Sequence, residues 1–301
     1  MKKQHLGDSD LTCTRLAYGC WRLAGSEGGP KVDPAEGRRA VQAAYDAGYT
    51  LFDHADIYGR GECERIFGQA LKEMPGAREH MILATKCGIC PPWDGAQHCY
   101  DSSAGHLIAS VEGSLSRLGV DEIDLLMIHR PDYLGDPAEM NEAFTKLRHH
   151  GKVRCFGVSN FKPSQVTALQ AACDFPVIAN QVEVSLSSLS TLDDGTLDQC
   201  LAEKITPMAW SPLAKGALLG SPHNERDAAV MALLDTLAAR HGVGRGEVAL
   251  AWLLRHPTKM IPIVGSVNPD RIRQAVKADE IEISRDDWYA LLIAARGSRL
   301  P

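Results

Sequence analysis

Thr50-Leu51-Phe52-Asp53 is a short apolar run that ends in a carboxylate, and two later segments repeat this pattern. The run from Met81 to Lys86 ends in an amine, and the run from Leu125 to His129 ends in an imidazole. Apolar runs of this length, bounded by turn residues, predict buried parallel strands. Because the C-terminal ends of barrel strands face one mouth, we expect these three polar groups to converge there. Tyr58, in the loop after Asp53, would join them.

Short apolar runs alternate with amphipathic helical stretches along the whole chain. A length of 301 residues fits two ordinary domains or one large α/β barrel, and no low-complexity linker divides the sequence. Eight such runs predict an α/β fold, a single (β/α)8 TIM barrel over residues 1–301. The expected strands are Arg15 to Cys20, Thr50 to Ala55, Met81 to Lys86, Leu125 to His129, Val153 to Ser159, Val177 to Val182, Thr206 to Ser211 and Met260 to Val264.

Capping residues mark the expected helices. The helix from Pro34 to Ala47 follows Asp33, a suitable N-cap, and stops at Gly48. The other helices considered are 163–173 and 269–278 and, as extra helices near the C-terminus, 226–241, 246–254 and 284–295, the last one capped by Ser284.

A doubly wound sheet is the main alternative to the barrel. That fold carries Gly-x-Gly-x-x-Gly after its first strand, where it opens a helix. The glycines between Gly25 and Gly29 follow the first expected strand but lack this spacing. The barrel is therefore favoured.

Composition narrows the class of protein. A net charge of -6 argues against a nucleic-acid binder, and no apolar run approaches the ~18 residues that span a bilayer. No apolar segment follows the positively charged start Met1-Lys2-Lys3, so we expect no secretory signal. The nine scattered cysteines are typical of reduced thiols. We therefore expect a cytoplasmic protein with neither a membrane nor a nucleic-acid partner.

One cysteine-rich stretch allows a zinc interpretation. Cys87-Gly88-Ile89-Cys90 is followed by His98 and Cys99. However, Cys87 adjoins Lys86 at a strand end, and the segment lacks the regular second ligand pair of a zinc module. We therefore expect no metal site.

The four polar groups at the expected mouth are suited to moving a proton on a carbonyl oxygen. Tyrosine has an ordinary pKa of about 10, and we expect the Lys86 ammonium to lower the pKa of Tyr58 while Asp53 balances the lysine charge. His129 can donate a hydrogen bond to the substrate oxygen. None of the four supplies electrons, which indicates a nicotinamide. Taken singly, they also fit a rim ion pair, a core histidine and a loop aromatic; their joint placement favours a reaction centre.

Several motifs are similar to those of one enzyme family. Phe52-Asp53-His54-Ala55-Asp56-Ile57-Tyr58-Gly59, Ala84-Thr85-Lys86, residues 124–131 and residues 151–161 occur in the order found in aldo-keto reductases. The chain resembles this family over nearly its whole length. The resemblance implies that Tyr58 is the general acid of carbonyl reduction, tuned by Lys86 and Asp53, and that His129 polarises the carbonyl.

The resemblance also implies an NADP(H) site. Ser159, Asn160 and Gln181 correspond to residues that hold the nicotinamide carboxamide, and Trp210 stands where most relatives stack a tyrosine. Arg271 corresponds to the arginine that grips the 2′-phosphate, which favours NADP(H) over NAD(H). The remaining implied cofactor residues are Gly19, Cys20 and Trp21, the pyrophosphate loop residues Ser211, Pro212, Leu213, Lys215 and Gly216, and Gly265, Ser266, Val267 and Gln274 at the adenine end. Ala275 replaces an asparagine that is common in relatives.

The substrate is expected to be a small carbonyl compound. Trp21 and Trp93, with Tyr58 and His129, would make the pocket partly apolar and aromatic. Two other functions stay open: a nucleotide-binding regulatory or sensing protein on the same barrel, and, less favoured, an unrelated barrel enzyme for phosphorylated substrates. No heptad seam indicates an oligomer, so the oligomeric state is open.

Overall fold

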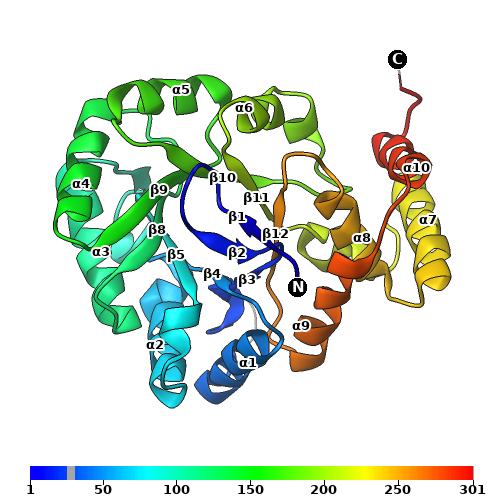
Figure 1. Cartoon of the computed structure of the whole chain (residues 1–301), viewed down its shortest axis with the longest axis horizontal. Coiled ribbons are helices and arrows are strands. Elements are labelled where there is room, and N and C mark those ends of the chain that lie inside the picture. The colour runs from blue at the N-terminus through cyan, green and yellow to red at the C-terminus, as the bar shows by residue number, and fades with distance from the viewer. Residues whose placement is uncertain (26–30, 301) are drawn as a thin grey trace.

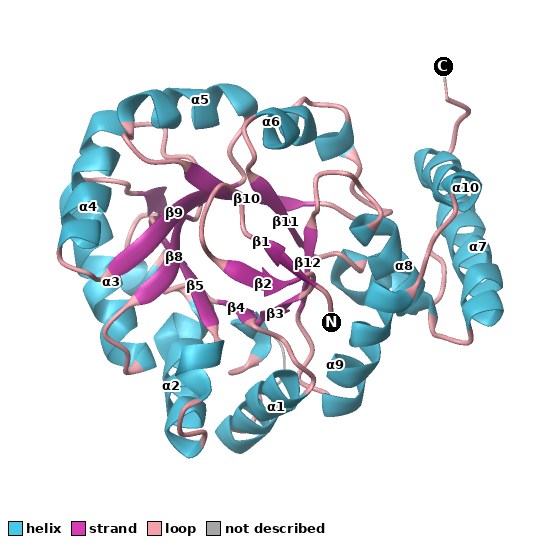
Figure 2. Ribbon diagram, in the orientation of Figure 1, coloured by secondary structure: helices cyan, strands magenta, loops and turns pink. Residues whose placement is uncertain are grey.

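The computed structural model describes residues 1–25 and 31–300, and its core is a closed barrel of eight parallel strands. Helices ring this barrel (Figures 1 and 2), so the predicted (β/α)8 fold is confirmed. Around the barrel the strand order is β10-β11-β12-β3-β4-β5-β8-β9. The strands are β3 (Ala17–Gly19), β4 (Leu51–Asp53), β5 (Ile82–Cys87), β8 (Ile123–Ile128), β9 (Val153–Ser159), β10 (Val177–Glu183), β11 (Thr206–Trp210) and β12 (Ile261–Val264).

The helices alternate with the strands as expected, and two of them lie outside the eightfold pattern. The helices are α1 (Pro34–Asp46), α2 (Glu62–Glu73), α3 (Ala104–Leu118), α4 (Pro137–His149), α5 (Pro163–Ala172), α6 (Thr196–Ala202), α7 (Glu225–His241), α8 (Arg245–Leu254), α9 (Pro269–Ala275) and α10 (Arg285–Arg296). The extra helices α7 and α10 pack against each other beside the barrel (Figure 1). None of the helices described is long and apolar enough to cross a membrane.

The predicted boundaries need small corrections. Strand β11 ends at Trp210 and not at Ser211 as predicted, because Ser211 takes a left-handed backbone conformation with φ 50°. The helix expected over 269–278 is α-helical only to Ala275 and continues as a 3₁₀ turn. The Ser284 cap is confirmed, since its Oγ accepts a hydrogen bond from the Asp287 amide at 3.0 Å. Of the glycine cluster 25–29, only Gly25 lies among the described residues.

A hairpin that the sequence did not predict closes the N-terminal end of the barrel. Its strands are β1 (Lys3–His5) and β2 (Thr12–Thr14), and the connecting turn packs Leu6 and Leu11 against the barrel interior. Gly7 is required in this turn: its φ is 59°, and a Cβ there would lie 2.2 Å from the backbone oxygen of Ile178. The barrel is therefore sealed at one end and open at the other.

Candidate active site

Asp53, Lys86 and His129 stand at the C-terminal ends of neighbouring strands, as predicted. Asp53 is the last residue of β4, Lys86 is the penultimate residue of β5, and His129 follows β8 directly. Tyr58 begins a 3₁₀ turn after β4 and packs against His129, with ring centroids 5.9 Å apart. The tertiary structure therefore brings all four side chains together at the mouth.

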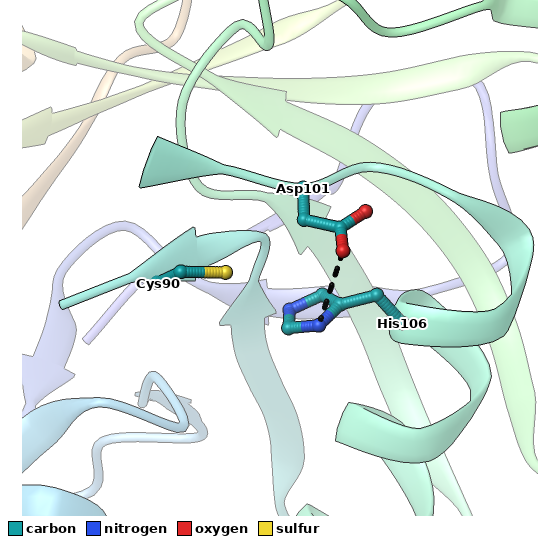
Figure 3. A group of neighbouring side chains, drawn as sticks. All are labelled: Cys90, Asp101 and His106. Carbon is teal, nitrogen blue, oxygen red and sulfur yellow. Dashed lines mark ion pairs between the residues drawn. The ribbon is translucent and has the colours of Figure 1, made fainter. Parts of the chain in front are cut away.

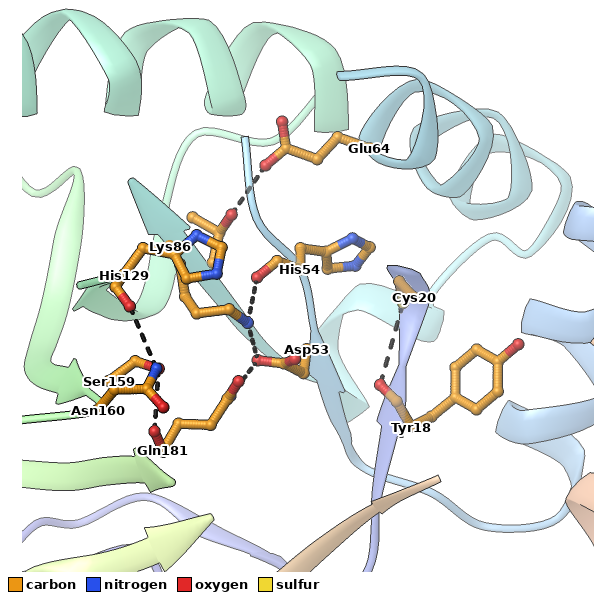
Figure 4. A network of polar contacts seen from close by, with 11 residues as sticks. Tyr18, Cys20, Asp53, His54, Glu64, Lys86, His129, Ser159, Asn160 and Gln181 are labelled. Atoms are coloured by element: carbon orange, nitrogen blue, oxygen red, sulfur yellow. Dashed lines mark hydrogen bonds and ion pairs between the residues drawn. The ribbon is translucent and has the colours of Figure 1, made fainter. Parts of the chain in front are cut away.

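A buried ion pair forms the base of this group. Lys86 Nζ donates to Asp53 Oδ1 at 2.7 Å and to the backbone oxygen of His54 at 2.7 Å (Figure 4). The same carboxylate oxygen accepts a hydrogen bond from Gln181 Nε2 at 2.8 Å. Lys86 is fully buried and Asp53 is 3% exposed. Burial lowers the pKa of Lys86, and the negative charge of Asp53 opposes that effect.

Tyr58 keeps its proton more firmly than the sequence suggested. Burial raises the pKa of the Tyr58 phenol well above 10, and the negative charge of Asp53 adds to the increase. Lys86 Nζ lies 5.1 Å from the centre of the tyrosine ring, but Asp53 already compensates its charge. The pKa of Tyr58 is therefore raised, not lowered as expected from the sequence, because burial is the largest influence on it. The phenol is protonated at neutral pH, which is the form that a proton donor requires.

His129 is a neutral imidazole. Burial lowers the pKa of His129 well below 6.5, and the positive charges of Lys86 and Arg130 lower it further. Its buried Nδ1 has no hydrogen-bond partner among the described residues. A neutral imidazole can donate one hydrogen bond without bringing a positive charge. The mouth therefore holds two uncharged proton-bearing groups, Tyr58 and His129, beside one ion pair.

A cavity of about 930 Å³ opens from this mouth. It begins at Tyr58 and His129 and continues to Arg271 at the start of α9. Among the predicted site residues, those that line it are Gly19, Trp21, Asp53, Tyr58, His129, Ser159, Asn160, Gln181, Trp210, Ser211, Pro212, Leu213, Lys215, Gly216, Gly265, Ser266, Val267, Arg271 and Gln274. The cavity is therefore long enough to border residues from six of the barrel strands.

Three predicted residues do not line this cavity. Cys20 is fully buried with its sulfur facing the backbone of Tyr18, because it begins a 3₁₀ turn that points it into the core. Lys86 lies behind Asp53. Trp93 packs under the guanidinium of Arg60 at 5.0 Å, on the hairpin outside the cavity. The predicted cofactor contact of Cys20 and the predicted pocket contact of Trp93 therefore lack support in the geometry.

A hydrogen-bonded chain of residues crosses the cavity wall where β9, β10 and β11 end. Ser159 Oγ donates to the backbone oxygen of Gln181 at 2.9 Å and accepts from Asn160 Nδ2 at 2.8 Å. Asn160 Oδ1 accepts a hydrogen bond from Trp210 Nε1 at 3.0 Å. Through Gln181 this chain reaches Asp53. Four residues from three strands therefore hold one another in fixed orientations beside the ion pair.

Strained backbone gathers around the same cavity. Asn160, Ser211, Ala214 and Lys215 have φ angles of 59°, 50°, 50° and 57°. Such left-handed conformations in residues other than glycine cost free energy and cluster at binding sites. Three of these residues belong to the loop after β11, where Gly216 has φ 99°. The backbone strain in this loop is therefore typical of a ligand-binding segment.

The sequence missed three arginines that line the cavity, Arg22, Arg130 and Arg245. Arg130 lies 5.9 Å from the centre of the Trp210 ring and could have been inferred from its place next to His129. Arg245 forms a two-pronged pair with Asp235 at 2.8 and 2.7 Å, and it also donates to the backbone oxygens of Leu218 and Gly220. Asp235 and Arg245 belong to α7 and α8, so only the tertiary structure could show that this pair borders the cavity.

The far end of the cavity lies at the start of α9. Asn268 caps this helix by accepting hydrogen bonds from the amides of Asp270 and Arg271 at 2.9 and 3.1 Å. Arg271 is exposed, and no ion pair holds it within the described parts of the chain. Its guanidinium is therefore available to a ligand that enters the cavity.

Comparison with known proteins identifies the family. The family model described as "Aldo/keto reductase family" matches residues 15–294. The chain belongs to the aldo/keto reductase family. It is 43% identical to a 6-dehydroglucose reductase of Novosphingobium aromaticivorans, over 99% of this chain and 97% of that protein. A 6-dehydroglucose reductase of Agrobacterium fabrum is 38% identical over all of both chains. The crystal structure of a thermostable aldo-keto reductase with the inhibitor epalrestat has a TM-score of 0.85, with 26% identity, covering 98% of this chain and 100% of its own.

This aldo/keto reductase is therefore an oxidoreductase, and members of its family use nicotinamide cofactors. Of the alternatives weighed from the sequence, the doubly wound sheet is excluded by the closed barrel, and the unrelated barrel enzyme is excluded by the family match.

Proposed function

We propose that this enzyme reduces an aldehyde or ketone to an alcohol with NADPH, using Tyr58 as the general acid. The observation that carries the proposal is the pairing of a protonated phenol with a neutral imidazole at the mouth of a long cavity. When bound, the nicotinamide supplies a hydride to the carbonyl carbon. The second half of the reduction, a proton for the carbonyl oxygen, then falls to the chain's own residues.

Each of the four mouth residues has a distinct part in that proton transfer. Tyr58 gives its phenolic proton to the carbonyl oxygen as negative charge develops there. His129 donates a hydrogen bond to the same oxygen, which orients the substrate before the transfer. Lys86 stabilises the phenolate that remains, and Asp53 holds the lysine in place through the 2.7 Å contact. Because the ion pair is dry, its field acts at close range with little screening.

The cavity residues fit NADP(H). Ser159, Asn160 and Gln181 present an organised set of hydroxyl and amide groups, the kind of partner that a carboxamide needs. The ring of Trp210 is fixed by its bond to Asn160 and offers an aromatic face. At the far end, the exposed guanidinium of Arg271 matches the geometry of a phosphate. We therefore assign the 2′-phosphate of NADP(H) to Arg271 and its neighbour Ser266.

The substrate class is the least constrained part of the proposal. Two relatives are named for the reduction of 6-dehydroglucose, a sugar with an aldehyde at carbon 6. The cavity near Tyr58 is bordered by Trp21 and by the charged side chains of Arg22 and Arg130. This mixture suits a hydroxylated aldehyde better than a purely apolar one. We propose that a sugar aldehyde is a better substrate than an aliphatic aldehyde of similar size.

The test follows NADPH oxidation by absorbance with a panel of aldehydes that includes 6-dehydroglucose, for the wild type and Tyr58→Phe. Removing a general acid costs typically ~10²–10⁴-fold in rate, so kcat should fall by about that factor while NADPH binding, measured by fluorescence titration, stays unchanged. Tyr289→Phe, far from the mouth on α10, is the matched control. Equal turnover by Tyr58→Phe and the wild type would refute the role of Tyr58. No turnover of any carbonyl by a wild type that binds NADPH would favour the regulatory alternative.

The cofactor assignment has its own test. Arg271→Ala should weaken the binding of NADPH at least tenfold and leave the binding of NADH nearly unchanged, because only NADPH carries the 2′-phosphate. Arg273→Ala, two residues along the same helix and paired with Asp270, serves as the control. If Arg271→Ala binds both cofactors as the wild type does, the 2′-phosphate does not bind here.

A further inference from the structure

A cluster of potential metal ligands lies on the loop between β5 and α3, outside the cavity just described. This loop folds into a hairpin of β6 (Ile89–Cys90) and β7 (Cys99–Tyr100). Cys90 Sγ, one carboxylate oxygen of Asp101 and one ring nitrogen of His106 all lie within 4.8 Å of one another. Figure 3 shows the sulfur of Cys90 pointing toward the imidazole, from a different element than the other two side chains. Residues from a strand, a turn and a helix therefore converge on one point.

Asp101 and His106 already have polar partners outside the cluster. His106 Nδ1 lies 3.8 Å from Asp101 Oδ2, while its Nε2 faces the hydroxyl of Ser110 at 3.4 Å. The second carboxylate oxygen, Asp101 Oδ1, accepts a hydrogen bond from the amide of Ser103 at 2.9 Å. In metal sites the ring nitrogen that does not bind the metal is usually held in this way. Asp101 and His106 therefore each have a second polar atom with a partner of its own.

A second thiol lies next to the first. Cys99 is the partner of Cys90 across the antiparallel hairpin. Partial burial, and then the neighbouring Cys99 and Asp101, raise the pKa of the Cys90 thiol to about 11. Without a cation the thiol therefore keeps its proton, and a metal that binds there would have to displace it.

We propose that Cys90, Asp101 and His106 bind one zinc ion, with Cys99 as the fourth ligand. Zinc prefers a tetrahedral set of sulfur, nitrogen and oxygen donors, at roughly 2.0–2.3 Å from the metal. Donors at such distances lie roughly 3.3–3.8 Å apart, so the side chains need to close by about 1 Å. All three of the clustered residues are half-buried, which leaves room for rotation.

This site differs from the ligand set that the sequence suggested and disfavoured. Cys87 is 1% exposed and faces the core, so it is unavailable. The ring of His98 packs against Tyr100 instead, with centroids 5.7 Å apart. Asp101 and His106 were not considered from the sequence, because their spacing from Cys90 matches no regular module. The turn from β7 into α3 is what brings them back to the hairpin.

A metal here would stabilise the hairpin that borders the mouth. The hairpin carries Trp93 at its tip, against Arg60, which lies two residues after Tyr58 in the same turn. Binding at the base of the hairpin would join β6 and β7 to α3. The zinc is therefore structural, with all four positions filled by the protein, and takes no part in the reduction.

The experiment uses the reduced, chelator-treated full chain and Co²⁺ as a spectroscopic probe, followed by competition with Zn²⁺. We expect one Co²⁺ per chain, with absorption bands of tetrahedral cobalt and a thiolate-to-cobalt charge-transfer band. Cys90→Ser and His106→Gln should each weaken binding by at least about 10–100-fold, the loss that even an outer partner's removal causes. Cys99→Ser should lose part of the charge-transfer band. Melting curves of each metal-free variant verify that it is folded.

His98→Gln and Cys173→Ser are the matched controls, because each removes the same kind of side chain outside the cluster. Both should bind Co²⁺ as the wild type does. Absence of Co²⁺ binding in the reduced wild type, or unchanged binding in Cys90→Ser and His106→Gln, would overturn the site. The loss of two thiols per chain on mild oxidation, abolished by Cys90→Ser in a protein that binds no Co²⁺, would identify a disulfide pair instead.

Discussion

The two ends of the barrel differ in how many partners a buried charged side chain has. At the closed end, Asp124 at the start of β8 is 3% exposed and is paired with Arg78 at 3.0 Å and with Arg154 at 3.1 Å. It also accepts the amide of Leu83 at 2.8 Å. At the open mouth, the fully buried Lys86 has one carboxylate partner among the described residues, Asp53. The buried charge at the closed end is therefore held by more partners than the one at the mouth.

Polar atoms without partners show the same contrast. Both ring nitrogens of His54, Oδ1 of Asp56 and Nδ1 of His129 are buried without a hydrogen bond to any described residue, and all three residues follow barrel strands at the mouth. Such groups cost free energy. In a barrel enzyme the C-terminal face carries function and the opposite face carries stability. The difference between the two ends follows from that division, and three variants measure it.

The largest effect is expected from Lys86→Met, which removes the fully buried cation at the mouth. Asp53 would be left buried and without its charged partner, and breaking a buried ion pair costs about 3–5 kcal/mol. Chemical denaturation should show that loss. Lys152→Met breaks the exposed pair with Glu112 and should cost at most ~1 kcal/mol. Similar losses of stability in both variants would mean that the buried ion pair of Lys86 contributes no more than an exposed one.

A smaller, pH-dependent effect is expected at Asp56, in the loop that leads to Tyr58. Burial, and then the charge of Glu64, raise the pKa of Asp56 to about 7. The folded state thus binds this proton more tightly than the unfolded state, whose pKa is about 3.9. The contribution of Asp56 to the free energy of unfolding is fully present below about pH 4 and is lost as the pH rises through about 7. The loss between pH 5 and pH 8 is roughly 2–3 kcal/mol.

Asp56→Asn should remove that loss. The stability of the variant relative to the wild type should therefore increase as the pH rises from 5 to 8. Denaturant unfolding of both proteins at several pH values measures the difference, with the exposed Asp46→Asn as the control. A difference between Asp56→Asn and the wild type that is constant over this range would show that Asp56 does not titrate there.

The smallest effect is expected at the closed end. Asp124→Asn keeps the shape of the side chain but loses its charge, and should cost about 1–2 kcal/mol because hydrogen bonds to the two arginines weaken. Its kcat should equal that of the wild type, since Asp124 is not among the described residues that line the cavity. Asp10→Asn, whose carboxylate pairs with Arg154 at 79% exposure, should change stability by less than ~1 kcal/mol. A fall in kcat for Asp124→Asn would contradict the separation of the two ends.

The sequence predicted the barrel because its signals are local. Eight apolar runs and the caps of α1 and α10 lie within a few neighbouring residues, and the strand ends placed Asp53, Lys86 and His129 at the mouth. The sequence could not predict that Cys20 turns into the core, or that Trp93 leaves the cavity for Arg60. Those outcomes depend on how a turn and a hairpin pack against other elements, which no local pattern records.

By itself, then, the sequence determined the periodicity of the chain, the family and the identity of the mouth residues. Only the tertiary structure decided their protonation, since the pKa values of Tyr58 and His129 depend on burial and on charges from other strands. It also decided the pairing of Asp235 with Arg245 and the convergence of Cys90, Asp101 and His106. The physical reason is that electrostatic energy depends on distance in space and on exclusion of water, and folding sets both between residues far apart in the chain.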